Sequence, residues 1–251
     1  MAVTHTLSDG IAEIVMQHPP VNALTVADTW KIRDTFAEVS KDPSLRAVIL
    51  TAEGKGFNAG IDIKEMQSVE GFEHLLGSGE ACYETFRQIY ETPVPVIAAV
   101  NDFCMGLGIG LVGSADIIIA SSNARFGLPE LDNGALGCAS HLARLVPPLK
   151  LRQMTFTCLP VSAQELCDYG TVFKVTAPDA LRDEARALAR QIADKPASAV
   201  RFAKAALNHI DPVDLHSNYR LEQGYTYQLN LMGIGDQQRD AFVKHEREVT
   251  R

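Results

Sequence analysis

The chain has 251 residues, of which 46% are hydrophobic and 22% charged, and its formal net charge is −8. This composition is ordinary for a soluble globular protein and is ample for a core. The acidic balance argues against binding to nucleic acid or to anionic membrane surfaces. No apolar run approaches the ~20 residues that span a bilayer.

The cysteines and histidines predict neither disulfides nor a metal site. The five cysteines are odd in number and lack CxxC spacing, so we expect them to be reduced. The seven histidines form neither an HExxH motif nor a Cys/His cluster. The N-terminus lacks the basic and then apolar pattern of a signal peptide, and we expect a cytoplasmic protein.

The first forty residues predict a hairpin and a helix. Apolar and polar residues alternate on both sides of an Asp-Gly pair over residues 6–16, which is typical of a β-hairpin. Thr25 is a favourable N-cap for a helix through Val39. The residues expected near the inner face of this helix are Val26, Trp30, Phe36 and Val39.

Two apolar strands then each run into a glycine-rich turn. A strand over 46–52 leads into the turn at 54–66, and a strand over 95–100 precedes the turn at 106–110, with a helical region over about 70–91 between them. The second turn enters a helix over about 106–114, and a third strand follows over 116–120. Turns of small residues expose backbone N–H groups, and two such turns can form an oxyanion hole.

The rest of the chain is predicted to be mostly helical. From residue 138 onward the helical pattern is broken by prolines and by an extended piece over 172–175. No strand signal appears after residue 197, and helices are expected over 219–231 and 236–246. We therefore predict a mixed α/β core over residues 1–192 and a C-terminal helical region over 193–251.

In this order, the segments resemble the crotonase superfamily, which includes the enoyl-CoA hydratases and isomerases. The resemblance covers nearly the whole chain, and the segments are residues 20–24, 57–66, 95–101, 106–110, 115–117, 126–130 and 134–145. It implies an α/β fold, a crotonase-type spiral of ββα units with a C-terminal helical region. It also implies assembly as a homotrimer or as a dimer of trimers, a hexamer.

The resemblance places the oxyanion hole on backbone groups of both turns. The donors would be the N–H of Ile61 and the N–H of Leu107, a position where the family commonly has glycine. A backbone donor survives that replacement, while the leucine side chain narrows the pocket. Asp62 is interpreted as an anchor of the first turn rather than as a catalyst.

The resemblance also implies which residues contact coenzyme A, which would arrive as part of the substrate rather than as a permanently bound cofactor. Contacts to adenine and pantetheine would come from Ala23, Leu24, Ala59 and Lys64. The nucleotide phosphates would meet residues of a neighbouring subunit, which are Phe242, Lys244 or Arg247.

One carboxylate of the hydratase mechanism is present and the other is missing. Glu130 matches one of the two catalytic glutamates, whereas the other falls on Gly110. Two carboxylates are needed to activate water and to deliver the proton in ordinary hydration. We therefore expect different chemistry, in a pocket that Gly110 has enlarged.

His141 is the second catalytic candidate, because it follows Glu130 by eleven residues and is expected at the start of a helix. It is a candidate base or water-positioning group, although a lone histidine is more often packed or exposed. Cys138 and Asp132 are weaker candidates of the same kind.

Two other motifs are interpreted as structural. Residues 108–113 match the dinucleotide-binding pattern GxGxxG, but seven residues separate Gly108 from the strand end at Val100. That pattern requires its first glycine at the strand end. Ser114 lacks the GxSxG spacing of a nucleophile elbow.

Within the superfamily, the chain resembles the bacterial branch that opens the last rings during steroid breakdown, including at residues 218–224 and 240–244. This resemblance implies retro-Claisen hydrolysis of a cyclic β-ketoacyl-CoA, with Glu130 or His141 activating the water. One alternative is an enoyl-CoA hydratase or Δ3-Δ2-enoyl-CoA isomerase that uses Glu130 alone. The other is a non-catalytic CoA- or RNA-binding module, for which RNA is disfavoured by the acidic charge.

Overall fold

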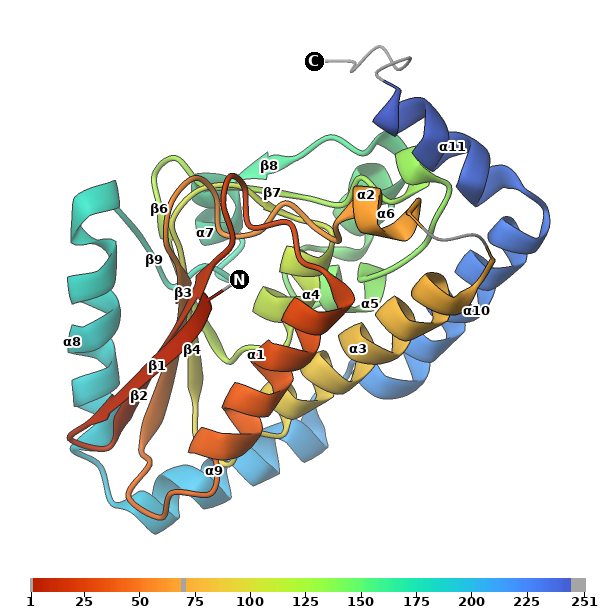
Figure 1. Ribbon diagram of the computed structural model, residues 1–251. Helices are drawn as coiled ribbons and strands as arrows, with labels where there is room; N and C mark the ends of the chain where they lie inside the picture. Colours follow the sequence, from red (N-terminus) through yellow and green to blue (C-terminus); the bar gives the residue numbers. More distant parts are fainter. Residues whose placement is uncertain (1, 69–70, 245–251) are drawn as a thin grey trace.

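A six-stranded sheet forms the centre of the protein (Figure 1). The structure is a computed structural model that describes residues 2–68 and 71–244. The strand order is β1-β2-β3-β4-β6-β9, with β1 and β2 antiparallel and the other pairs parallel. The strands are Ala2–Ser8, Ile11–Gln17, Ala47–Ala52, Val96–Val100, Ile117–Ser121 and Lys174–Thr176.

The predicted hairpin and the three predicted strands that follow it are confirmed. Asp9 and Gly10 both have positive φ, as a two-residue hairpin turn requires. A second sheet of three short strands was not predicted, because strands of two or three residues show no periodicity. Its members are β5 (Cys104–Met105), β7 (Arg125–Gly127) and β8 (Val161–Ser162).

Helices cover both faces of the large sheet (Figure 1). They are α1 Val26–Val39, α2 Ile63–Met66, α3 Glu73–Tyr90, α4 Leu107–Gly113, α5 Ala139–Leu142, α6 Pro148–Thr157, α7 Ala163–Asp168, α8 Leu181–Ala193, α9 Ala197–Ile210, α10 Leu215–Leu231 and α11 Ile234–Val243, with 3₁₀ turns η1 Leu131–Asn133 and η2 Pro178–Ala180.

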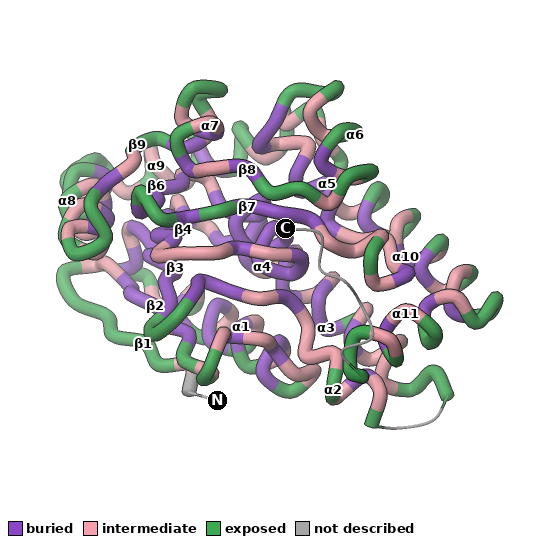
Figure 2. Tube along the Cα trace, turned by 90° about the horizontal axis from the view of Figure 1, so that it is seen from above, coloured by how far each residue is buried: buried purple, intermediate pink, exposed green. Residues whose placement is uncertain are grey.

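Alternation along the central strands produces two cores. Val48 and Leu50 point into the main core with α1, α3 and α4, whereas Ala47 and Ile49 point to the other face and pack with α8. Because both faces are covered, β3 and β4 are buried along their whole length and, apart from Thr51, are apolar (Figure 2).

The N-cap of α1 is as predicted, but its inner face is partly different. The Thr25 hydroxyl accepts the N–H of Asp28 within a capping box. Phe36 is buried, whereas Trp30 is only half-buried and lies beneath the Arg33 guanidinium. Of the predicted face, Val39 is also buried and Val26 is half-buried; Ile32, which was not predicted, completes the buried stripe.

The C-terminal region is helical, as predicted, and its helices start earlier than expected. Asp214 accepts the N–H of Ser217 and starts α10 four residues before the predicted start. In Figure 1, α10 runs beside α3, and it also contacts α5 and α11. α8 ends at Ala193, next to the predicted boundary between residues 1–192 and 193–251, which stays a prediction.

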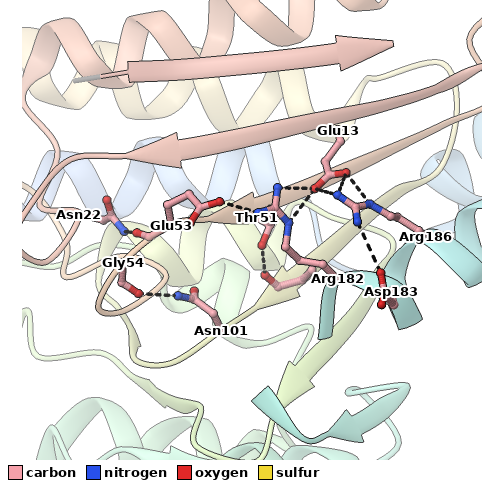
Figure 3. Close-up of polar contacts among 10 residues, drawn as sticks. Glu13, Asn22, Thr51, Glu53, Gly54, Asn101, Arg182, Asp183 and Arg186 are labelled. Atoms are coloured by element: carbon pink, nitrogen blue, oxygen red, sulfur yellow. Dashed lines mark hydrogen bonds and ion pairs between the residues drawn. The ribbon is translucent and has the colours of Figure 1, made fainter. Parts of the chain in front are cut away.

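A charged network fastens α8 to the sheet (Figure 3). The Glu13 carboxylate of β2 accepts N–H groups of Arg182 at 2.9 Å and of Arg186 at 2.9 Å. Burial alone raises the pKa of Glu13, but the two guanidinium groups outweigh it and lower that pKa overall. Arg182 also bonds Glu53, at the end of β3, where the first glycine turn begins.

Candidate active site

The structure brings the two glycine-rich turns together. The segments that lead into them pair as a parallel bridge between Asn58 and Cys104, and the N–H of Met105 donates to the carbonyl of Asn58 at 2.9 Å. The turns then touch: a Cβ atom built on Gly106 would lie 3.7 Å from the Cα of Gly60.

The side chains of Asn22 and Asn101, from two other segments, hold the start of the first turn. The amide of Asn22 donates to the carbonyls of Glu53 and Gly56 at 3.0 and 2.9 Å. Asn101 donates to the carbonyl of Gly54 at 3.1 Å (Figure 3). These bonds satisfy carbonyls that a glycine-rich loop would otherwise leave to water.

The end of the first turn is fixed around Ile61. The N–H of Leu24 donates to Gly60 at 3.0 Å, and the N–H of Asp62 returns a bond to Leu24 at 2.9 Å. The Asp62 carboxylate caps α2 by accepting the N–H of Lys64 at 2.9 Å, which is the anchoring role expected for it. The N–H of Ile61 donates to no acceptor within residues 2–68 and 71–244, so it is free for a ligand.

The second turn presents its N–H at the start of a helix. Gly106 has φ of +55°, and Leu107 is the first residue of α4. The first N–H groups of a helix have no intrahelical partner, and that of Leu107 donates to no acceptor in the described part of the chain. Because Leu107 lies at the N-terminus of α4, the positive end of the helix dipole also favours a negative charge at this N–H.

The free donors border a cavity of about 140 Å³. Ala59 and Ile61 line it from the first turn, Leu107 from the second, and Glu130 from the loop after β7. Among the described residues that line it, Glu130 is the only aspartate or glutamate. Most of the remaining lining side chains are apolar, so charges in the cavity are poorly screened.

Glu130 lies directly against the second turn. Its Oε1 atom would be 2.6 Å from a Cβ built on Gly106, and the φ of +55° at Gly106 favours glycine at this position. Its buried Oε2 has no hydrogen-bond partner among the described residues. Burial raises the pKa of Glu130 to about 8, and the nearby Glu222 carboxylate adds to the rise.

The place of the missing second carboxylate is filled by an aromatic ring. A Cβ built on Gly110 would lie 2.1 Å from the Cζ of Phe86 on α3, and Gly110 does not line the cavity. The expectation that Gly110 enlarges the pocket is therefore wrong. The sequence could not reveal this, because Phe86 comes from a helix twenty-four residues away in the chain.

His141 is not brought to the cavity. It is 1% exposed and packs against the rings of Phe86 at 4.7 Å and Tyr219 at 5.3 Å between centroids. Burial lowers the pKa of His141 to about 3, helped by the positive charge of Arg144. His141 is therefore a neutral, packed side chain, and its position does not support a role in activating water.

Of the two weaker candidates, Cys138 lies at the cavity and Asp132 does not. Cys138 lines the cavity, and burial raises the pKa of its thiol well above the usual value. Such a thiol is protonated and a poor nucleophile. Asp132 is exposed and does not line the cavity.

The residues expected to contact coenzyme A lie near one another, although only Ala59 lines the cavity. Leu24 is fully buried and supports the first turn through its backbone, and Ala23 precedes it. Lys64 is exposed on α2.

The expected phosphate contacts were assigned to a neighbouring subunit. Phe242 and Lys244 are exposed, and they lie at the end of α11, which packs against α2 of the same chain. One bond between α11 and the end of α2 runs from the Gln67 amide to the Asp240 carboxylate at 2.6 Å. Arg247 lies outside the described residues.

Sequence reasoning missed the wall that the C-terminal helices provide. Tyr219, Gln223 and Tyr227 line the cavity from α10, and Arg239 lines it from α11. The one available signal was polar residues recurring at helical spacing in a predicted helix, which is also typical of a solvent-exposed face. The loop over 134–139 is joined to α10 by Glu222, which accepts the N–H of Ala139 at 2.8 Å.

Comparison with known proteins identifies the family. A family model described as enoyl-CoA hydratase/isomerase matches residues 6–231. The chain belongs to this family. The crotonase resemblance is thereby confirmed, and with it the expectation that the protein acts on CoA thioesters.

Two curated relatives agree with the more specific resemblance. A protein of Rhodococcus jostii, named (7aS)-7a-methyl-1,5-dioxo-2,3,5,6,7,7a-hexahydro-1H-indene-carboxyl-CoA hydrolase, is 48% identical over 97% of this chain and 95% of its own. A protein of the same name from Mycobacterium tuberculosis is 49% identical over 97% of this chain and 99% of its own. The resemblance to the ring-opening branch is thus confirmed.

Solved structures confirm the predicted fold. An enoyl-CoA hydratase from Mycobacterium avium subsp. paratuberculosis superposes with a TM-score of 0.85, covering 95% of this chain and 98% of that one at 24% identity. An enoyl-CoA hydratase from Mycobacterium smegmatis is 30% identical, with a TM-score of 0.78 and coverage of 97% and 96%. In the described part of this chain, no helix has both the length and the apolar character needed to cross a membrane.

Proposed function

We propose that this protein is an acyl-CoA hydrolase that opens a ring by cleaving a carbon–carbon bond of a cyclic β-ketoacyl-CoA in steroid breakdown. The relatives from Rhodococcus jostii and Mycobacterium tuberculosis, whose names describe hydrolases of a bicyclic dioxo acyl-CoA, support this reaction. The observation that carries it is Glu130, the one carboxyl among the described residues that line the cavity, beside two free backbone donors.

The oxyanion hole stabilises the negative charge of the intermediate. The N–H groups of Ile61 and Leu107 would bind the thioester oxygen and hold it as an enolate when the carbon–carbon bond breaks. A preorganised donor of this kind is worth about 3–4 kcal/mol in the transition state. The poorly hydrated cavity strengthens these bonds relative to the same bonds in water.

One carboxyl group is enough for the proton transfers. Ionised Glu130 accepts a proton as the water oxygen adds to the ring ketone carbon. The bond between that carbon and the α-carbon then breaks, and its electron pair becomes the thioester enolate. Glu130 returns the proton to the α-carbon, while the former ketone carbon becomes a carboxyl group that loses its proton to solvent.

The position of Glu130 suits this double use. Its carboxyl touches Gly106, one residue before the Leu107 donor, so it lies next to the place where the enolate forms. A pKa of about 8 lets the group accept and return a proton near neutral pH. The filled space at Gly110 excludes the second carboxylate of an ordinary hydratase.

The reaction is tested with a panel of CoA thioesters analysed by mass spectrometry. A bicyclic β-ketoacyl-CoA is expected to gain the mass of one water and to retain its CoA. A Δ3-Δ2-enoyl-CoA isomerase also needs one carboxylate, so 3-enoyl-CoA substrates belong in the panel. Hydration of crotonyl-CoA or isomerisation of a 3-enoyl-CoA, with the bicyclic substrate unchanged, would replace ring opening by that reaction.

We also propose that the chain assembles into homotrimers or dimers of trimers. Several helices expose large apolar side chains. These include Phe156 on α6, Phe202 and Ile210 on α9, and Leu231 at the end of α10. Surfaces of this kind mark protein interfaces. Light scattering during gel filtration should give three or six times the chain mass of 27.3 kDa; a monomer would contradict the proposal.

A further inference from the structure

Arg239 gives the cavity a positive charge. It lies on α11 and is only 7% exposed. Among the described residues that line the cavity, Arg239 is the only lysine or arginine. The reaction steps above make no use of it.

The guanidinium is held in place and still has donors to spare. Its Nε donates to Gln67 at 2.8 Å, and its Nη2 donates to Asn230 at 2.7 Å and to Asp236. These partners come from the end of α2, from α10 and from α11, so three segments fix the plane of the group. Its Nη1 donates to no acceptor in the described part of the chain.

The pairing with Asp236 leaves much of the positive charge available. The Asp236 side chain is 65% exposed, so water screens its attraction for the guanidinium. Inside the cavity, where apolar groups predominate, the same guanidinium interacts with an anion far more strongly. A fixed guanidinium with free N–H groups matches the planar geometry of a carboxylate.

We propose that Arg239 binds the carboxylate that ring opening creates. This inference rests on the proposed hydrolysis, in which a neutral ring ketone becomes a carboxylate on the same molecule as the CoA thioester. The ligand class is therefore an acyl-CoA with a second, free carboxylate on its acyl chain. Binding to Arg239 strengthens as the charge appears, so Arg239 is a specificity-determining residue that favours the opened product state.

The test measures equilibrium binding by calorimetry and needs no turnover. Two series of thioesters are compared at each chain length, straight-chain acyl-CoAs and the corresponding ω-carboxyacyl-CoAs. The wild-type protein is expected to bind the carboxylated member at least about tenfold more tightly at one or more lengths. Arg239→Gln should remove that preference, and Arg239→Lys should retain part of it.

Asp236→Asn provides the matched control, because it breaks the same ion pair while leaving the guanidinium in place. If Arg239 binds a carboxylate, this variant keeps or increases the preference. If Arg239 only clamps α11 to its neighbours, Gln67→Ala, which removes the acceptor at the end of α2, and Arg239→Gln should behave alike. Equal loss in both variants, or no preference in the wild type, would overturn the inference.

Further measurements distinguish failure of the Arg239 site from misfolding of the variant and from failure of the proposed function. Circular dichroism shows whether Arg239→Gln folds; if it does not, Arg239→Lys and Asp236→Asn still decide the question. A carboxylate preference without ring opening would refute the proposed function and leave the binding site standing. Ring opening without the preference would refute the Arg239 site alone.

Discussion

The chemistry of the cavity depends on the protonation of one residue, Glu130. Burial of the carboxyl, whose Oε2 has no hydrogen-bond partner among the described residues, raises the pKa of Glu130 to about 8. The base that accepts a proton from water must be ionised. At neutral pH only a minority of the free enzyme therefore carries the active form.

Replacing Glu130 by glutamine should lower kcat by at least about tenfold, because the amide cannot carry the proton. In the wild-type enzyme, kcat/KM should rise with pH and level off above about pH 8, as the Glu130 carboxyl ionises. Steady-state rates of ring opening from pH 6 to 9 measure both effects. Unchanged turnover in the variant, or a rate that falls through this range, would remove Glu130 from the role of base.

His141 should affect stability in acid rather than catalysis. Its pKa of about 3 in the folded protein lies below the ordinary value of 6.5. The unfolded chain therefore binds more protons between these values, and stability is lost as the pH falls from about 6.5, by up to about 1.4 kcal/mol per pH unit.

Denaturant unfolding between pH 4 and 7 checks this expectation with two variants. His141→Leu should flatten the acid-induced loss of stability, whereas His209→Leu, at an exposed position of α9, should not. Turnover of His141→Leu at pH 8 should stay well above that of Glu130→Gln. A loss of turnover equal to that of Glu130→Gln in a stably folded His141→Leu protein would restore His141 as a catalytic residue.

At the residue scale, the sequence predicts what local segments determine. Ile61, Leu107 and Glu130 lie in or beside turns whose conformation is set by their own glycines, and the structure brings all three to one cavity. The packing of His141 could not be predicted, because its surroundings come from Phe86 and Tyr219, on helices distant in the sequence. Arg239 was missed for the same reason.

At the scale of elements, the packing of α3 against α4 decides which chemistry is available. The Phe86 ring of α3 fills the space beside Gly110 of α4, so a side chain at position 110 collides with that ring. The close approach requires glycine at this point, and the same contact keeps the ring beside His141.

Introducing the missing glutamate should therefore fail without a second change. Gly110→Glu alone is expected to destabilise the protein by about 1–3 kcal/mol through overpacking. In a Phe86→Ala protein, where the ring is absent, Gly110→Glu should cost less stability than it does in the wild-type protein. Thermal unfolding of both variants and of Phe86→Ala measures this coupling; additive effects would show that the ring does not occupy the space beside residue 110.

Element prediction succeeded where patterns were long and failed where they were short. The strands of the large sheet were evident from continuous apolar runs, since both sheet faces are covered. Strands β5, β7 and β8 contain two or three residues and are formed by pairing with one another. The early start of α10 depends on the cap at Asp214, which lies outside the apolar pattern.

In the whole molecule, the large sheet with α8 and the cavity of the candidate active site occupy different parts of the fold. The large sheet with α8 and its charged network gives a rigid base from which the first glycine turn leaves (Figure 3). The cavity forms on the other side, between the two turns, the loop that carries Glu130 and the C-terminal helices. The last part of the chain therefore forms one wall of the cavity.

In the proposed reaction, water cleaves a ring carbon–carbon bond while the thioester stays intact. Mass spectrometry of a bicyclic β-ketoacyl-CoA, incubated with the enzyme in heavy-oxygen water, tests it most directly. The product is expected to keep its CoA and to carry one heavy oxygen in a new carboxylate, and Glu130→Gln should form it far more slowly. Release of free CoA, or a heavy oxygen present as a hydroxyl group on an unopened ring, would contradict it.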